Sequence, residues 1–284
     1  MGLYDREYTK HDFGDGGQFP QMRFSLPHVT PVVKWLLIIN IGVYLLSVII
    51  KPLGNIIYQV FQLDSTSPLR SLQLWRLVSY QFLHDPHLIS HIVFNMLGLY
   101  FLGPTLEKYW GSRKFLVFYL SCGIAGGIFY LLLSLVGFLS PGVMVGASGA
   151  ILGMLAACAI LFPHFVVFLI IFPVPIRLAA VLFTFMYIVN LFAGGVNAGG
   201  DAAHLAGMGA GAGYVLTQGW RTRIRLKLRA DKWEKNLDLQ RKLEIEVDRI
   251  LQKVHELGIH SLSRKEKQIL KKATKLQQLQ SARR

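Results

Sequence analysis

Long apolar stretches alternate with short polar breaks through the first 220 residues of the chain. Residues 115–176 and 178–200 contain no Asp, Glu, Lys or Arg. A membrane core about 30 Å thick needs roughly 20 apolar residues per helix, so stretches of this length predict several crossings rather than one soluble core. Clusters of Pro, Gly and Ser mark the breaks between crossings. Six spans are predicted, at residues 32–50, 88–106, 114–136, 147–162, 177–193 and 202–219.

Two of the connections between the spans are long. Residues 163–176 are apolar, but prolines bound this segment and it is too short to cross a membrane. We therefore expect it to form an interfacial or re-entrant connection on the cytoplasmic side. The connection at residues 51–87 is of mixed polarity and is expected to be a self-structured loop on the outer side.

Lys and Arg set the predicted orientation, because they concentrate in loops on the cytoplasmic side of membrane proteins. The connection between the second and third spans holds Lys108, Arg113 and Lys114, and the residues that follow the sixth span are also basic. The loops at 137–146 and 194–201 contain neither Lys nor Arg. Because six spans place both ends on one side, both termini are expected in the cytoplasm.

Composition and charge divide the chain into a hydrophobic body and a basic tail. Charged residues make up 16% of the chain, against roughly 25% in soluble domains, which argues against a soluble enzyme. The formal net charge is +14, and residues 221–284 carry 19 Lys and Arg against 8 Asp and Glu. Three parts are predicted: a polar N-terminal segment at 1–31, a six-span domain at 32–219 and a basic helical cytoplasmic tail at 220–284.

The tail shows two helical patterns. Apolar residues at spacings of three and four predict a helix that ends at Gly258, and Ser263 with Glu266 forms a capping-box pattern that opens a second helix. The two can form an αα-hairpin. The basic charge favours attraction to anionic membrane lipid. Nucleic acid is not expected as a partner, because acidic residues are interleaved and aromatic residues are nearly absent. Binding of a partner through the apolar stripe stays open.

Four polar side chains stand out within the predicted spans, where ionisable and amide groups are costly and are therefore functional candidates. His91 and Asn95 lie four residues apart on one face of the second span. Ser148 lies at the start of the fourth span between small residues, Ala147 and Gly149, and His204 lies near the start of the sixth. Each alone has a structural explanation, such as close helix packing at Ser148 or hydrogen bonding within the bundle at either histidine.

Together these residues are the set that acyl transfer requires. Ser148 and His204 each follow an outside loop, so both are expected at similar depth just below the outer surface. Small residues such as Gly153 and Gly207 would let the two helices approach closely, as a serine–histidine hydrogen bond of about 2.6–3.2 Å requires. Asp201, three residues before His204, is interpreted as the N-cap of the sixth helix rather than as a third member of the site.

Five motifs in sequence order carry a family resemblance. They are Trp75-Arg76, His91-x-x-x-Asn95, Gly103-x-x-x-Glu107-x-x-x-Gly111, Gly146-x-Ser148-Gly149 and His204-x-x-Gly207-x-x-x-Gly211. Each motif is weakly specific, but the five in this order and on these spans make a specific pattern. The chain resembles the rhomboid family of intramembrane serine proteases over roughly residues 32–219.

The resemblance implies an all-α membrane protein, a six-transmembrane-helix rhomboid-like bundle, with a Ser148–His204 dyad and no third acid. Ser148 would attack the scissile carbonyl, and His204 would act as general base. The side chains of His91 and Asn95 and the backbone N–H of Ser148 would hold the oxyanion. Glu107 would be structural, bonding loop backbone near the cytoplasmic face.

One position departs from the family pattern. In well-studied rhomboids the residue four after the serine is an aromatic that stacks on the catalytic histidine, whereas this chain has Leu152 there. We therefore expect another group to orient His204.

The predicted function is an intramembrane serine protease that cleaves single-span membrane proteins near their outer boundary. The glycine-rich loop at 194–201 is the expected lid, and the fifth span is the expected lateral gate for the substrate. The alternative is a proteolytically inactive rhomboid-like protein that binds membrane clients. Retention of both Ser148 and His204 favours the enzyme. A solute transporter is disfavoured because no internal repeat is apparent.

The remaining expectations concern cofactors and location. His84 and His87 lie upstream of His91, but no fourth ligand stands at a suitable spacing, so we expect neither a metal nor another cofactor. The protein is expected to be a multi-pass component of a bacterial inner membrane.

Overall fold

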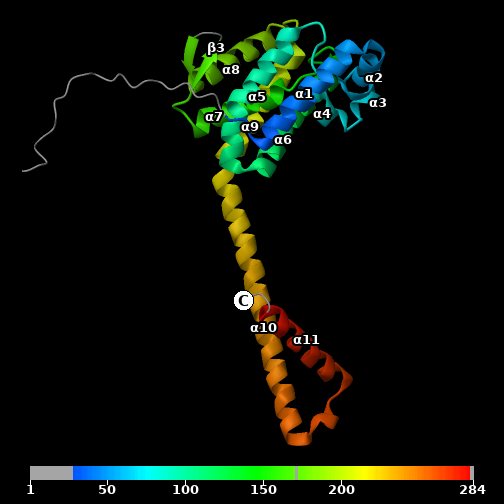
Figure 1. Ribbon diagram of the computed structural model, residues 1–284, viewed down its shortest axis with the longest axis vertical. Helices are drawn as coiled ribbons and strands as arrows, with labels where there is room; N and C mark the ends of the chain where they lie inside the picture. Colours follow the sequence, from blue (N-terminus) through cyan, green and yellow to red (C-terminus); the bar gives the residue numbers. More distant parts are fainter. Residues whose placement is uncertain (1–27, 170–171, 282–284) are drawn as a thin grey trace, which may run out of the picture. The chain divides into compact units, whose positions relative to one another are not determined.

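The computed structural model describes residues 28–169 and 172–281. The chain divides into two compact units, one ending at Ala212 and the other beginning at Gly213. Helices make up most of both units, with two short two-stranded sheets in the first (Figure 1).

Each of the six predicted spans corresponds to a helix, with ends that differ by a few residues. They are α1 Pro31–Ile49, α5 Ile89–Trp110, α6 Ser112–Leu135, α7 Ser148–Leu161, α8 Ile176–Phe192 and α9 Ala198–Leu216. Within the described residues, α1, α5 and α6 are long and apolar enough to cross a membrane, and α7 and α8 are shorter apolar helices. The helices therefore support a membrane protein, and the count of six crossings stays a prediction.

The connection after α1 is structured, as predicted. It contains the helix α2 (Lys51–Phe61), the strand β1 (Leu63–Asp64) and the short helices α3 (Pro68–Ser71), α4 (Arg76–Ser79) and η2 (Tyr80–Phe82). Strand β1 pairs antiparallel with β2 (Val143–Met144), so that Leu63 lies opposite Met144. This pairing attaches the loop to the segment that leads into α7.

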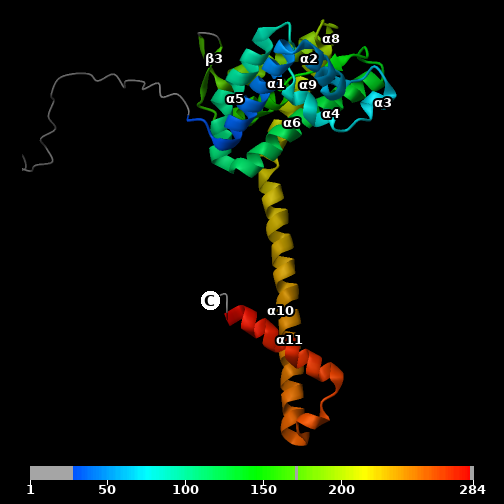
Figure 2. The same cartoon turned by 45° about the vertical axis from the view of Figure 1, so that its right-hand side comes forward.

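The prediction of a wholly helical fold was wrong at residues 163–176. This segment forms an antiparallel hairpin of β3 (Val166–Leu169) and β4 (Phe172–Pro175), which projects from the edge of the helical bundle in both views (Figures 1 and 2). Pro173 and Pro175 interrupt helix formation, and β-branched valines favour extended backbone. Proline is tolerated because both strands of a two-stranded sheet are edge strands.

Burial distinguishes α7 from α8. Eleven consecutive residues of α7, Gly149 to Ala159, are buried, so α7 is the central helix of the first unit. In α8 only Ile176, Ala179 and Leu191 are buried among 17 residues. Helix α8 is therefore the more weakly held of the two.

The second unit contains the predicted αα-hairpin. Helix α10 (Gln218–Leu257) ends at Gly258, whose φ of 78° favours glycine. Helix α11 (Arg264–Ser281) folds back against α10 (Figures 1 and 2). The capping box is present: the Ser263 N–H donates to Glu266 at 2.7 Å, and the Glu266 N–H donates to the Ser263 hydroxyl at 3.3 Å.

Candidate active site

The structure brings the two main predicted site residues together. The Oγ of Ser148 and the Nε2 of His204 lie 2.7 Å apart. Ser148 is the first residue of α7, and His204 lies in the second turn of α9. A serine hydroxyl at this distance from an imidazole nitrogen can transfer its proton to it.

Backbone contact between α7 and α9 makes this distance possible. A Cβ on Gly207 would collide with the carbonyl of Gly149, and a Cβ on Gly211 would collide with the carbonyl of Gly153. The prediction that small residues allow close approach of these two helices is confirmed.

The chain enters α7 through a glycine that the site also requires. Gly146 has a φ of 131°, which L side chains rarely adopt. A Cβ there would lie 2.7 Å from the Nε2 of His91 and 3.6 Å from the Oγ of Ser148. The His91 ring and the serine hydroxyl therefore flank the same small space beside Gly146.

The hydrogen bonds of His91 determine which of its nitrogens can donate. The backbone N–H of Asp85 donates to the Nδ1 of His91 at 3.4 Å. Since Nδ1 is then the acceptor, the proton of the neutral ring is on Nε2, the nitrogen beside Gly146. His91 is thus arranged to donate a hydrogen bond into the space near Ser148.

Asn95 provides a second unused donor. Its side chain is 5% exposed, and its Nδ2 has no hydrogen-bond partner among the described residues. Buried amide donors are normally paired, so an unpaired one calls for an explanation such as a functional role. The backbone N–H of Ser148 is a third donor, because the first N–H groups of a helix have no acceptor within it.

The interpretation of Asp201 as an N-cap was wrong. Helix α9 begins at Ala198, so Asp201 lies within the first turn and is 2% exposed. Its Oδ1 lies 3.7 Å from the Nδ1 of His204, and its Oδ2 accepts a hydrogen bond of 3.0 Å from the Nδ2 of Asn190 on α8. Asp201 and His204 are three residues apart in the sequence, which already allowed this contact. Because the helix was expected to start at residue 202, Asp201 was assigned to its N-cap instead.

Sequence reasoning missed Tyr187. The ring of this α8 residue lies against the His204 ring, with centroids 4.6 Å apart and an interplanar angle of 55°. Leu152 indeed leaves the imidazole without an aromatic partner from α7, and Tyr187 supplies one from another helix. No spacing rule joins residues 187 and 204, so only the packing of α8 on α9 could reveal the contact.

The other motif residues hold the scaffold. Glu107 accepts hydrogen bonds from the backbone N–H groups of Val32 and Val33 at 3.0 Å, the Thr30 hydroxyl at 2.5 Å and the Ser112 hydroxyl at 2.6 Å. Glu107 therefore has a structural role, and it acts by holding the start of α1. Arg76 is buried and donates to the carbonyls of residues 59 and 62, which fixes the loop after α1.

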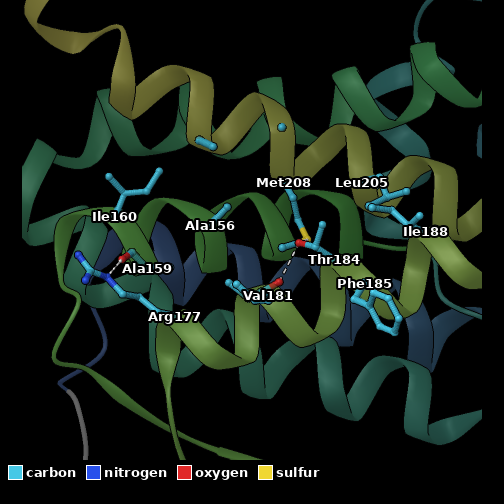
Figure 3. Close-up of a pocket in the computed structure, with 13 residues that line it drawn as sticks. Ala156, Ala159, Ile160, Arg177, Val181, Thr184, Phe185, Ile188, Leu205 and Met208 are labelled. Carbon is cyan, nitrogen blue, oxygen red and sulfur yellow. Dashed lines mark hydrogen bonds between the residues drawn. The ribbon is translucent and has the colours of Figure 1, made fainter.

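A groove of about 760 Å³ runs between α7, α8 and α9 (Figure 3). Its lining is apolar apart from Arg177 and Thr184. Leu205 lies at one end, next in sequence to His204, but neither Ser148 nor His204 lines the groove. The groove therefore lies beside the candidate site rather than forming the site.

Comparison with known proteins gives matches to two families and to several relatives. Residues 71–221 match the Rhomboid domain, and residues 239–275 match a family of unknown function, DUF6576. The chain is 41% identical over 83 residues to "Rhomboid protease GluP" of Bacillus subtilis, covering 29% of this chain and 15% of that protein. It is 30% identical over 194 residues to "RHOMBOID-like protein 12, mitochondrial" of Arabidopsis thaliana, covering 62% and 55%.

A third relative is "Rhomboid protease GlpG" of Yersinia pestis, 28% identical over 113 residues, which cover 38% of this chain and 39% of that protein. The matches to these three relatives span between 15% and 55% of their length. Two have names that include protease, and one is named only as rhomboid-like. The Rhomboid domain match covers more than half of the chain, and the protein therefore belongs to the rhomboid family.

Proposed function

We propose that this protein is an intramembrane serine protease with Ser148 as nucleophile and His204 as general base. The 2.7 Å separation of Oγ and Nε2 carries the proposal. His204 takes the hydroxyl proton as Ser148 attacks the peptide carbonyl, and returns a proton to the leaving amine. The acyl-enzyme is then hydrolysed by water that the same histidine activates.

Three donors would stabilise the tetrahedral oxyanion. They are the Nε2–H of His91, the Nδ2–H of Asn95 and the backbone N–H of Ser148. The proposal is supported by the tautomer that the Asp85 N–H imposes on His91 and by the unpaired amide of Asn95. Donors fixed in place before the reaction lower the barrier because they need no reorganisation.

The test is covalent labelling with a fluorophosphonate. The wild-type protein, purified in detergent, is expected to be labelled, whereas Ser148→Ala and His204→Ala are not. Ser121→Ala is the matched control, because Ser121 lies in α6 and its hydroxyl bonds only its own helix. Equal labelling of all four proteins would overturn the dyad. Such a result would favour the alternative of an inactive, client-binding rhomboid-like protein.

The substrates that we propose are single-span membrane proteins cut near their outer boundary. Helix α8 is the proposed lateral gate, which its few buried residues support. The loop at 194–201 is the proposed lid. In liposomes, a membrane-embedded substrate should be cleaved much faster than a soluble unstructured peptide. Equal rates would contradict the gate.

For topology, we propose six crossings with both termini in the cytoplasm of a bacterial inner membrane. The charge distribution among the loops supports the orientation. The relatives include a mitochondrial protein as well as bacterial ones, so they support a membrane location in general. We also propose that the basic tail contacts anionic lipid. Truncation after Trp220 should weaken binding to anionic liposomes, and unchanged binding would contradict this role.

A further inference from the structure

Helices α8 and α9 meet along a seam of three side-chain contacts. Asn190 bonds Asp201 at 3.0 Å, Tyr187 packs on His204, and the Thr184 hydroxyl lies 3.7 Å from the sulfur of Met208. In these three pairs the residue number decreases along α8 as it increases along α9, as expected for antiparallel neighbours. Each helix contributes a residue every three or four positions, which is the spacing of one helix face.

His204 has contacts to this seam as well as to Ser148 on α7. Its Nε2 faces Ser148, its ring lies on Tyr187, and its Nδ1 points toward Asp201 at 3.7 Å. Nδ1 has no hydrogen-bond partner among the described residues. A proton on Nδ1 is attracted by the carboxylate, and this leaves Nε2 free to accept the serine proton.

Asp201 itself is held from α8. It is 2% exposed, so its charge is kept from water, and the amide of Asn190 is its hydrogen-bond donor from another helix. Without Asn190, the Asp201 carboxylate loses the hydrogen bond that orients it toward the imidazole of His204 on the same helix. A rotation that shortens the 3.7 Å separation would create a full Asp–His hydrogen bond, and such bonds often tighten only when substrate is bound.

We propose that Asp201, Asn190 and Tyr187 are positioning residues for His204, so that α8 controls the base. This rests on the proposed function of the Ser148–His204 pair. Both contacts to α8 break when α8 moves away from α9. The base is then correctly oriented only when α8 is closed on α9.

The test measures the rate of fluorophosphonate labelling of Ser148 as a function of pH in the full-length protein. Asp201→Asn keeps the shape of the side chain and removes its charge. We expect the plateau rate to fall about 10-fold. The acidic limb of the pH profile should move to lower pH, because a neutral amide does not favour the protonated imidazole as a carboxylate does. A defect that is only structural would lower the plateau without moving the limb.

The limb can be attributed to His204 because few titratable groups face it. Asp201 lies on its own helix, Tyr187 faces it from α8, and His91 on α5 is close enough to interact with its charge. His91→Asn in the Asp201→Asn background should leave the shift in place. If the shift disappears, the limb belongs to His91 and the inference is overturned.

The role of Asn190 is tested by comparing the labelling rates of the single and double variants. If Asn190 acts only through Asp201, Asn190→Ala lowers the rate, but adding it to Asp201→Asn lowers it no further. Thr184→Ala is the matched control, since it removes a seam contact that does not reach His204, and its rate should stay within about twofold of wild type. If the fold-losses in rate of the Asn190 and Asp201 substitutions multiply in the double variant, the mechanism is contradicted.

Tyr187 is tested by keeping or removing its ring. Tyr187→Phe should label within about twofold of wild type, and Tyr187→Leu about 10-fold more slowly, which is the range of an aromatic pair contact. A wild-type protein that is not labelled overturns the proposed function, and this inference with it. A labelled wild type whose Asp201, Asn190 and Tyr187 variants match its rate and pH profile overturns only the inference.

Discussion

The carbonyl of Gly149 occupies the position that a Cβ on Gly207 would take. Helices α7 and α9 thus touch through their backbones at the residue after Ser148 and about one turn after His204. The length of the bond between these two side chains follows from that backbone contact. Any side chain at residue 207 must push the helices apart.

Gly207→Ala is expected to lower the rate of peptide hydrolysis about 10²-fold, because a displacement of about 1 Å between reacting groups has an effect of this size. The measurement is turnover of a membrane-embedded substrate in liposomes. Gly209→Ala on the same helix is the control, since nothing lies within 4 Å of its Cβ position. Similar losses in both variants would count against the close-contact explanation.

Gly146→Ala should abolish most activity while the protein remains folded. The substitution combines an unfavourable backbone angle with a contact of 2.7 Å to the Nε2 of His91. Gly137 has a φ of 77° and open space around its Cβ position, so Gly137→Ala shows the backbone effect alone. The pair is compared by labelling rate and thermal unfolding. Gly146→Ala should lose the labelling that Gly137→Ala keeps.

Asn95→Ala is expected to slow hydrolysis by about 10² to 10³, as for loss of one oxyanion donor. Because Nδ2 makes no hydrogen bond among the described residues, its removal should hardly change the thermal unfolding midpoint. Activity and stability are measured on the same preparation in detergent. A large fall in the midpoint with a proportionate loss of activity would instead indicate a structural role for Asn95.

Glu107→Ala should destabilise the first unit by about 3 kcal/mol, because a charged acceptor of several hydrogen bonds is lost at the start of α1. The thermal unfolding midpoint in a fixed detergent reports the change. Lys108→Ala, at the exposed neighbouring position, is the control and should stay near the wild-type value. Equal midpoints for the two variants would show that these bonds contribute little.

The tail hairpin should lose stability in acid. The pKa of Glu266 is lowered to about 2 by the backbone N–H of Ser263, the ammonium of Lys253 and the Ser263 hydroxyl. A carboxyl whose folded pKa lies below its ordinary 4.5 stabilises the fold above pH 4.5, and this contribution is lost as the pH falls toward 2.

Hydrogen exchange of the full chain tests this dependence. Wild type should protect the α10–α11 turn more than Glu266→Gln at pH 6, and the difference should shrink toward pH 2. Glu256→Gln alters an exposed pair within α10 and should match wild type throughout. A wild-type advantage that is the same at every pH would contradict the role of the charge.

Local pattern was sufficient to predict the six apolar helices and the Ser148–His204 pair. Apolar runs fix helices by their length, and the small residues around Ser148 and His204 indicated which two helices would touch. The β3–β4 hairpin was missed because an apolar run between prolines has the same composition in an extended or a re-entrant form. The roles of Tyr187 and Asn190 were missed because they depend on how α8 packs against α9, which sequence spacing does not encode.

Helix α7 has 14 residues, which at 1.5 Å per residue span about 21 Å. If α7 is one of the proposed crossings and one of its ends reaches a boundary of the hydrocarbon core, which is about 30 Å thick, its other end lies roughly 9 Å inside that core. If the C-terminal end reaches the cytoplasmic boundary, that submerged end carries Ser148. Water then has to reach Ser148 from the outer surface through a depth of several molecular diameters, and a substrate helix meets Ser148 only where its own backbone has left the lipid. Under the proposed function, the length of this one helix would set the level at which a substrate is cut.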